Sequence, residues 1–202
     1  MTYITHKKFA VWFGIIGAMM VYMNGLLEIN YYLNLIMFIT FSKIGGLFPD
    51  IDHQWHAVKE KTVINFILNK LIMLTGGKHR SWQTHSLDIA LIFSLLSYFI
   101  PKIIYNKGIL NIVDMELTYT IFIGFSLGWI SHLVSDMLTS EGVRLLCFVK
   151  KTRIALVPRK FLWLKFATGE VWESFIFRVI QVINVIIAVI AIILPFKDII
   201  LR

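Results

Sequence analysis

Apolar residues gather into five stretches along this chain, and polar segments separate most of them. A helix needs about 20 mostly apolar residues to cross the hydrocarbon core of a bilayer. Each stretch is close to this length, so the pattern predicts a chain that crosses a membrane back and forth. The stretches are Phe9–Leu27, Ile29–Phe48, Leu87–Tyr105, Thr118–Leu138 and Phe175–Phe196.

Two further segments have different patterns. Thr62–Leu74 is too short to span a bilayer and gathers its polar residues on one face, which predicts an amphipathic helix lying in the membrane interface. Residues Arg153–Ala167 alternate polar and apolar positions around Pro158-Arg159, which predicts a short β-hairpin. The predicted fold is an all-α membrane protein with about five transmembrane helices, an interfacial amphipathic helix and a short cytoplasmic β-hairpin.

The composition agrees with a membrane protein. Of the 202 residues, 57% are hydrophobic and 16% are charged, whereas a soluble domain has about 45–50% apolar and about 25% charged residues. No long polar linker divides the chain, so residues 1–202 are predicted to form a single polytopic domain. Lys7 and Lys8 before the first stretch are also typical of a signal peptide, but no small-x-small cleavage site follows, which favours a retained helix.

Most of the 20 lysines and arginines fall on one side of the predicted topology, together with the N-terminus. Because basic residues stay on the cytoplasmic side of membranes, this side is predicted to be cytoplasmic. The asymmetry and attraction to anionic headgroups explain the net charge of +8, so no nucleic-acid partner is expected. Cys147 is the single cysteine, which excludes an internal disulfide and a cysteine-based metal motif.

Histidines and aspartates lie at the same cytoplasmic end of the apolar stretches. His132 and Asp136 are four residues apart, so they share one helix face and can bind one metal or bridge two. The alternative is a structural hydrogen bond, but ionisable groups in membrane helices are costly and usually functional. The candidate metal ligands are His6, Asp50, Asp52, His79, His85, His132 and Asp136.

Three residues are candidates for the chemistry itself. Asp52 or Glu173, if not bound to metal, can act as a general base, and Arg80 can neutralise a phosphate. Each has a structural alternative: aspartates cap helices, an arginine anchors at headgroup level, and a glutamate compensates a helix dipole. Because several segments deliver His or Asp to one plane, the combination favours a metal site built between helices.

The motifs, in order, are Thr5-His6, the Gly-x-x-x-Pro-Asp-x-Asp turn from Gly45 to Asp52, His79-Arg80-x-x-x-Thr84-His85-Ser86, Gly128-x-x-Ser131-His132-x-x-x-Asp136-x-x-Thr139-x-x-Gly142, and Thr168-Gly169 followed by Glu173. Together they resemble the YdjM-like family of bacterial inner-membrane metal-dependent hydrolases. One departure is Gln83, which lengthens the spacing between His79 and His85. The resemblance covers residues 5 to 175 and implies a metal-dependent hydrolase of the bacterial cytoplasmic membrane.

The order His, Pro-Asp, His, His-x-x-x-Asp is also similar to that of zinc-dependent phospholipases C and related nucleases. Those helical proteins cleave phosphoesters at multinuclear zinc sites. This resemblance implies hydrolysis of a phosphoester in a lipid or lipid-linked, amphiphilic substrate, with one to three divalent ions. Mixed His and Asp ligands suit zinc, with manganese or iron as alternatives.

Two other functions stay open at this point. A metal transporter or ion-coupled carrier would hold its site near the bilayer midplane, whereas these candidates cluster at helix ends. A non-catalytic scaffold or regulator, in which metal joins the helices, would have saturated coordination and no adjoining cleft. The sequence assigns no oligomeric state.

Overall fold

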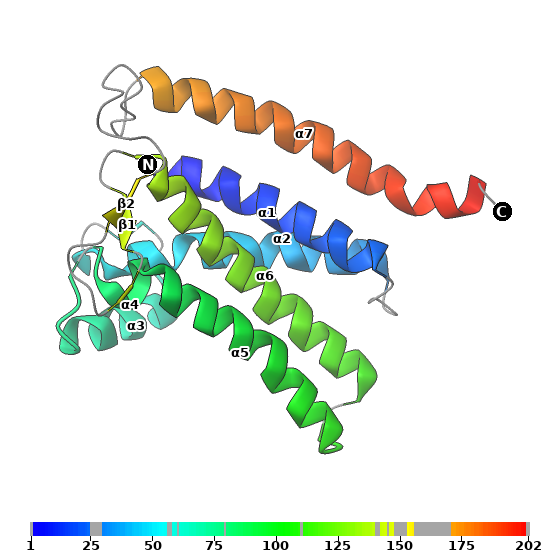
Figure 1. Cartoon of the computed structure of the whole chain (residues 1–202), viewed down its shortest axis with the longest axis horizontal. Helices are drawn as coiled ribbons and strands as arrows, with labels where there is room; N and C mark the ends of the chain where they lie inside the picture. Colours follow the sequence, from blue (N-terminus) through cyan, green and yellow to red (C-terminus); the bar gives the residue numbers. More distant parts are fainter. Residues whose placement is uncertain are drawn as a thin grey trace.

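The computed structural model describes residues 2–24, 30–55, 58–59, 61–78, 80–109, 111–139, 142–144, 146–147, 153–155 and 171–200. Within them, long helices form a bundle and short elements gather at one end of it (Figure 1). The long helices are α1 (Tyr3–Met23), α2 (Tyr31–Leu47), α5 (Leu87–Asn106), α6 (Ile112–Met137) and α7 (Val171–Ile200). The short elements are the 3-10 helix η1 (Pro49–Asp52), α3 (Val63–Leu74), α4 (Trp82–His85), β1 (Val143–Arg144) and β2 (Arg153–Ile154).

Four helices in the described part of the chain are long and apolar enough to cross a membrane. They cover Tyr31–Asp52, Leu87–Asn106, Met115–Met137 and Glu173–Pro195, which confirms four of the five predicted spans. The predicted first span, Phe9–Leu27, is not among them. Residues 25–27 of this prediction lie outside the described part of the chain. Within that part, α1 takes Lys7 and Lys8 into its first turns, and its apolar part runs from Phe9 to Met23. That part is only about 22 Å long at 1.5 Å per residue.

The backbones of α2 and α6 touch because glycines stand where they cross. A Cβ atom added at Gly128 would lie 1.9 Å from the carbonyl oxygen of Ser42, and one added at Gly45 would lie 1.9 Å from that of Phe125. Small residues allow such close approach between membrane helices. The Ser42 hydroxyl also donates a hydrogen bond of 2.7 Å to the carbonyl oxygen of Ala10, which ties α1 to the same pair. At the end of α2, Oδ1 of Asp50 in η1 lies 3.8 Å from Nε2 of His132 on α6.

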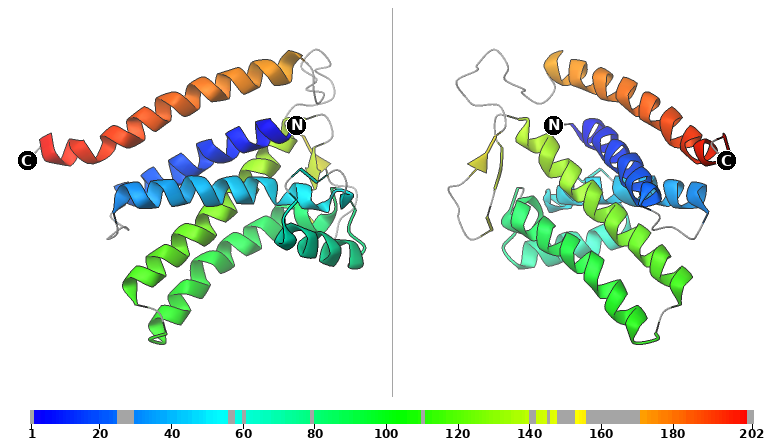
Figure 2. Two further views of the ribbon diagram at one scale, coloured as in Figure 1. Left: turned by 180° about the vertical axis from the view of Figure 1, so that it is seen from behind. Right: turned by 45° about the vertical axis from the view of Figure 1, so that its right-hand side comes forward.

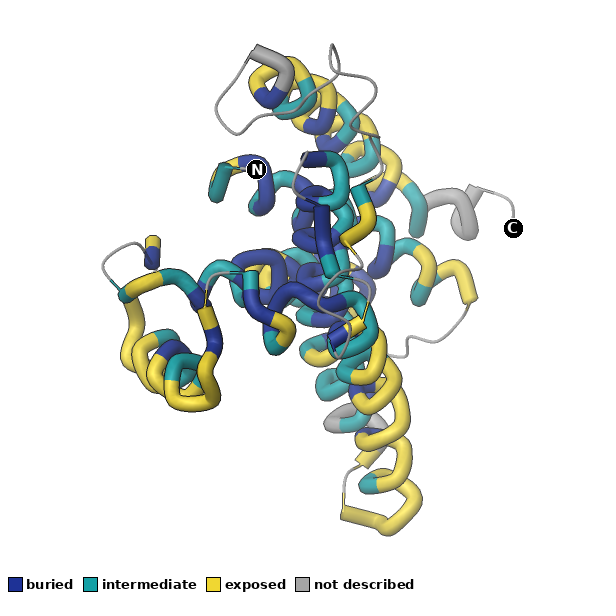
Figure 3. Tube along the Cα trace, turned by 60° about the vertical axis from the view of Figure 1, so that its left-hand side comes forward, coloured by how far each residue is buried: buried dark blue, intermediate teal, exposed yellow. Residues whose placement is uncertain are grey.

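Apolar side chains cover the outer surfaces of the bundle. In α5, Leu95 and Phe99 are 59% and 52% exposed, and in α7, Val182 and Val185 are 59% and 61% exposed. Figure 3 shows exposed positions on the outer helix faces and buried positions where the helices meet. A soluble monomer rarely exposes apolar surface on this scale, whereas a bilayer covers it.

The predicted interfacial helix is present as α3. Its buried side carries Asn69, whose side-chain amide donates hydrogen bonds to the carbonyl oxygens of Ile51 (2.5 Å) and His53 (2.8 Å). These bonds fix α3 against η1. The exposed apolar side chains of α3 are Val63, Ile64, Phe66, Ile67, Leu71 and Leu74. Such a helix is suited to lie in the membrane interface beside the ends of the spans.

A two-stranded antiparallel hairpin is also present. Arg153 and Ile154 form a strand as predicted, and their partner is the upstream segment Val143–Arg144. The other predicted strand, residues 160–167, lies outside the described residues. Gly142, with φ 63°, directly precedes β1, and a Cβ atom added there would lie 2.6 Å from the carbonyl oxygen of Ile154 on β2. Figure 2 shows the strands at the same end of the bundle as the N-terminus.

Gly128→Ala is expected to destabilise the protein by about 1–3 kcal/mol, because the new methyl group collides with the backbone of α2. Gly124→Ala is the matched control one turn earlier, because its Cβ would lie no closer than 3.3 Å to a neighbour. Thermal unfolding in detergent, followed by far-UV circular dichroism, should give the lower midpoint for Gly128→Ala. Equal midpoints would contradict the close contact of α2 and α6.

Candidate metal centre

The carboxylate of Asp136, near the end of α6, is surrounded by three imidazoles. Its Oδ1 atom lies 3.5 Å from Nε2 of His6, and its Oδ2 atom lies 3.7 Å and 3.6 Å from Nε2 of His85 and His132. The four residues come from α1, α4 and α6, and each is at most 2% exposed. The structure therefore brings four of the sequence-predicted ligands together at one end of the bundle.

The Nδ1 atoms of His132 and His85 face hydrogen-bond acceptors. Nδ1 of His132 donates to the carbonyl oxygen of Gly46 at 2.8 Å, a contact that the crossing of α2 and α6 makes possible. Nδ1 of His85 donates to Oδ2 of Asp52 at 3.0 Å. A neutral imidazole whose Nδ1 carries the proton presents a lone pair at Nε2, which is the tautomer that a metal requires.

Nδ1 of His6 also faces a hydrogen-bond acceptor, which in this case is a hydroxyl group. Its Nδ1 lies 2.6 Å from the hydroxyl oxygen of Ser135, and that hydroxyl donates its own proton to the carbonyl oxygen of His132 at 2.8 Å. Ser135 therefore accepts from His6, and Nε2 of His6 also presents a lone pair toward Asp136. Burial lowers the pKa of the His6 imidazole well below its ordinary value, and the neighbouring His132 lowers the pKa further, so His6 is neutral at neutral pH.

The distances around Asp136 fit a metal better than hydrogen bonds. At 3.5–3.7 Å, the three Nε2 atoms lie beyond the 2.7–3.2 Å of a normal hydrogen bond to oxygen. Two ligands that each lie about 2.0–2.2 Å from a tetrahedral zinc are roughly 3.3–3.6 Å apart. Nε2 of His132 is buried and makes no hydrogen bond within the described residues. The residues therefore fit a divalent metal.

Asp50 joins a second group of possible ligands. Its Oδ1 lies 3.8 Å from Nε2 of His132, and Asp50, His85 and His132 place their ligand atoms within 4.8 Å of one another. His6, His132 and Asp136 form the other such group, so His132 is shared. Two groups with a shared imidazole can hold one or two ions. The Asp50 side chain is 26% exposed, which makes it the open side of the cluster.

Asp52 lies behind the cluster. It is fully buried, and its Oδ2 accepts hydrogen bonds from the Thr84 hydroxyl at 2.5 Å and from His85. Neither group of possible metal ligands in the described chain includes Asp52. Its position orients His85. The indole of Trp129 adds to this by donating to the carbonyl oxygen of Thr84 at 2.8 Å, which holds α4 against α6.

The remaining candidates take separate positions. Nη2 of Arg80 lies 3.8 Å from Oδ1 of Asp136, so the guanidinium faces the cluster. Glu173, at the start of α7, accepts hydrogen bonds from the Thr5 hydroxyl at 2.8 Å and from the backbone N–H of Thr2. It thereby fixes the first turn of α1, which carries His6. His79 lies outside the described residues.

Two hydrogen-bond partners of the imidazoles were not predicted from the sequence: Ser135, which accepts from His6, and the carbonyl oxygen of Gly46, which accepts from His132. One signal for Ser135 was present: Ser131 and Ser135 are four residues apart, just as His132 and Asp136 are, so small polar and ligand residues share one face of α6. No sequence signal marks a backbone carbonyl.

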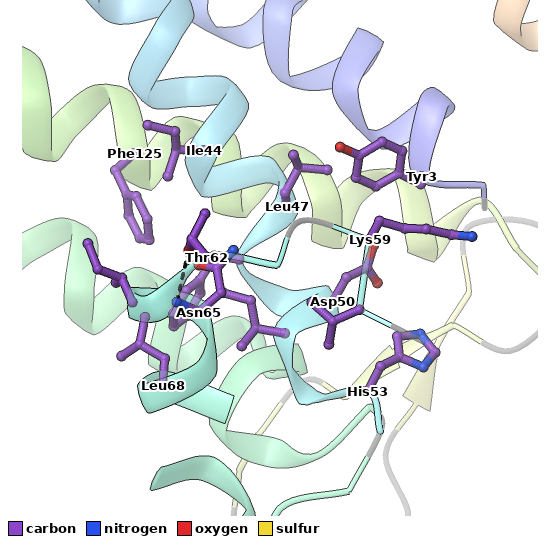
Figure 4. A pocket seen from close by; sticks show the side chains of 14 residues that line it. Tyr3, Ile44, Leu47, Asp50, His53, Lys59, Thr62, Asn65, Leu68 and Phe125 are labelled. Atoms are coloured by element: carbon purple, nitrogen blue, oxygen red, sulfur yellow. Dashed lines mark hydrogen bonds between the residues drawn. The ribbon is translucent and has the colours of Figure 1, made fainter. Parts of the chain in front are cut away.

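A pocket of about 700 Å³ lies against the open side of the cluster (Figure 4). Asp50 of η1 and His53, the residue after η1, form part of its wall, with Thr62 and Asn65 at the start of α3. Much of the remaining lining is apolar and comes from α2, α3 and α6, through Ile44, Leu47, Phe48, Ile64, Leu68 and Phe125. Asp50 therefore belongs both to the cluster and to an apolar pocket beside the interfacial helix.

The chain matches the family of the YdjM inner membrane protein over residues 1–198. It belongs to this family. The match confirms the resemblance drawn from the motifs, and with the four candidate spans in the described residues it identifies a multi-pass membrane protein. No curated protein and no solved structure matches the chain. The hydrolase activity that the resemblance implies stays a prediction.

Ser135→Ala is expected to weaken zinc binding by about tenfold, because it removes the acceptor that orients His6. Ser131→Ala is the matched control: it removes another buried hydroxyl of α6, one that donates only to the Gly128 carbonyl. Titration of the metal-free protein with zinc against a chelating indicator measures both affinities. A similar change in the two variants would show that Ser135 has no special relation to the cluster.

Proposed function

We propose that this protein is a membrane-bound, metal-dependent hydrolase that cleaves the phosphoester of a lipid or lipid-linked substrate. The observation that carries the proposal is the position of Asp50, which belongs to a group of metal ligands and to the wall of a largely apolar pocket. A substrate with an apolar chain in this pocket would place its polar group at the cluster.

The ligand residues hold the metal in this proposal. His6, His85, His132 and Asp136 present their ligand atoms from one side, and Asp50 completes the set from the pocket. Zinc suits these ligands, with manganese and iron as the alternatives. When bound, such a metal supplies Lewis acidity and lowers the pKa of a coordinated water toward 7.

The other polar residues bind the substrate or position the ligands. The Arg80 guanidinium, at ion-pair distance from Asp136, is placed to neutralise the charge of a phosphate. Asp52 holds His85, and Glu173 holds the start of α1, so we assign positioning roles to both. Asp50, the most exposed of the ligand carboxylates, is the one that can accept a proton from the pocket side.

The membrane setting supports an amphiphilic substrate. The pocket borders α3, whose exposed apolar side chains suit the interface. The basic residues of the chain concentrate on the side where the cluster lies, which supports a cytoplasmic site with a cytoplasmic N-terminus. A transporter would hold its ligands near the bilayer midplane, whereas this cluster lies at helix ends. A metal that only joins the helices would need no adjoining pocket.

Leu68→Trp is expected to reduce hydrolysis of dioleoyl phosphatidic acid in mixed micelles by about tenfold or more, because the indole fills the pocket that would hold the chain. Hydrolysis of p-nitrophenyl phosphate, which has no long chain, should change little. Leu71→Trp is the matched control, because Leu71 lies on the same helix, is 53% exposed and does not line the pocket. Released phosphate measures both reactions, and His132→Ala should abolish them.

Two results would overturn the proposal. If wild-type protein loaded with zinc, manganese or iron releases phosphate from neither compound, the assignment as a hydrolase of these phosphoesters is wrong. Uptake of metal into proteoliposomes by the same preparation would replace it with transport. If Leu68→Trp and Leu71→Trp reduce lipid hydrolysis equally, the pocket does not hold the chain.

A further inference from the structure

Two arginines face each other across the hairpin, next to the candidate metal centre. Arg144 on β1 lies directly opposite Arg153 on β2 in the antiparallel pair. Opposite residues of such a pair project from the same face, and like charges at these positions destabilise the pairing. An anion bound between the two guanidinium groups would convert this repulsion into attraction.

A third arginine completes the arrangement. Arg80, Arg144 and Arg153 line one narrow pocket together with His85. This is the imidazole whose Nε2 faces Asp136, so the pocket adjoins the candidate metal centre. It shares no lining residue with the apolar pocket at Asp50, so the two pockets are separate.

The backbone of Arg80 is held in an unusual conformation. Its φ is 59°, and among the described residues it alone is a non-glycine with positive φ. An arginine in this region is strained, and such strain concentrates at ligand sites, where the position of the side chain matters more than backbone stability. The conformation directs the chain between α3 and α4 so that Arg80 reaches both Asp136 and the narrow pocket.

Arg144 has a buried donor that no described residue satisfies. Its Nε atom is shielded from solvent and makes no hydrogen bond within the described part of the chain, and no carboxylate there forms an ion pair with Arg144 or Arg153. Buried donors are paired in nearly all proteins, so an unsatisfied guanidinium nitrogen beside a pocket indicates a missing acceptor.

The strand that carries Arg144 is fixed to the elements of the metal centre. Arg144 forms a parallel bridge with Ser86, the residue that follows His85. A little further on, the backbone N–H of Cys147 donates to Oδ2 of Asp88 in the first turn of α5 at 2.9 Å. The position of Arg144 relative to His85 is therefore set by backbone contacts.

We propose that Arg80, Arg144 and Arg153 form a binding site for a phosphate group. Guanidinium groups bind phosphate oxygens through paired, charge-assisted hydrogen bonds, and three of them suit a doubly charged tetrahedral anion. The proposal rests on the proposed function, in which this phosphate is the one that is cleaved or released at the metal centre. The exposed side chain of Arg153 can move aside to admit the anion.

The test is binding of inorganic phosphate to the full-length protein in detergent after treatment with EDTA. Isothermal titration calorimetry should give affinities that are weakened about tenfold or more in Arg144→Gln and in Arg153→Gln. Arg178→Gln is the matched control, because it removes an equally charged, exposed residue of α7 that does not line the pocket. Phosphate should raise the thermal unfolding midpoint of the wild type and of Arg178→Gln, and raise that of Arg153→Gln much less.

Unchanged phosphate affinity in Arg153→Gln, an exposed position where folding should be preserved, would overturn the proposal. Equal affinity of the wild type for acetate would overturn the assignment to phosphate. A second experiment distinguishes a lipid headgroup from soluble phosphate as the natural source of the bound phosphate group. It measures phosphate binding by the protein in nanodiscs of phosphatidylcholine with or without phosphatidic acid. Weaker phosphate binding in the presence of phosphatidic acid assigns the site to a lipid headgroup, and unchanged binding assigns it to soluble phosphate.

Failure of this proposal can be told apart from failure of the proposed function. Phosphate binding is measured without metal and without turnover. If it depends on the arginines while no phosphoester is cleaved, the anion site stands and the hydrolase assignment falls. If phosphoesters are cleaved while the arginine variants bind phosphate normally, the hydrolase assignment stands and the anion site falls.

Discussion

Burial of the Asp136 carboxylate is the interaction on which the end of the bundle depends. A carboxylate that is 2% exposed is costly inside a protein unless opposite charge or ligand bonds compensate for it. Arg80 lies 3.8 Å away, and three imidazoles lie 3.5–3.7 Å away. A neutral imidazole directs a nitrogen lone pair toward the carboxylate oxygens. Because lone pairs and carboxylate oxygens both attract positive charge, the arrangement favours a cation between the imidazoles and the carboxylate. Together with Asp50, the cluster supplies negative charge and nitrogen lone pairs, as a divalent metal requires.

The rest of the fold positions these groups. The contact between α2 and α6 at Gly45 and Gly128 brings the Gly46 carbonyl to His132. The hydrogen bonds of Asn69 place α3 against η1, so the wall of the largely apolar pocket includes Asp50. The helix α3 also exposes apolar side chains, which suits a position in the membrane interface. The fold therefore places the possible metal ligands beside a largely apolar pocket at the end of the bundle.

Local patterns in the sequence predicted much of this arrangement, and contacts between distant segments account for the rest. The spacing of His132 and Asp136 fixes their common helix face, and the length of the apolar stretches gives four of the five spans. By contrast, the imidazole partners come from far along the chain: Gly46 is 86 positions from His132, and Ser135 is 129 positions from His6. The alternation around Arg153 predicted a strand there, but the pairing of this strand with Val143–Arg144 had no local signal, because alternation marks a strand without specifying what it pairs with.

X-ray absorption at the zinc K-edge tests the central claim most directly, applied to protein loaded with one equivalent of zinc and washed without chelators. Nitrogen and oxygen ligands at about 2.0–2.2 Å are expected, with the multiple scattering of at least two imidazoles. Asp136→Asn should lose this signal, because the buried carboxylate is the common neighbour of the three histidines. Wild-type protein that retains no stoichiometric zinc, or a spectrum without imidazole scattering, would contradict a metal centre at this cluster.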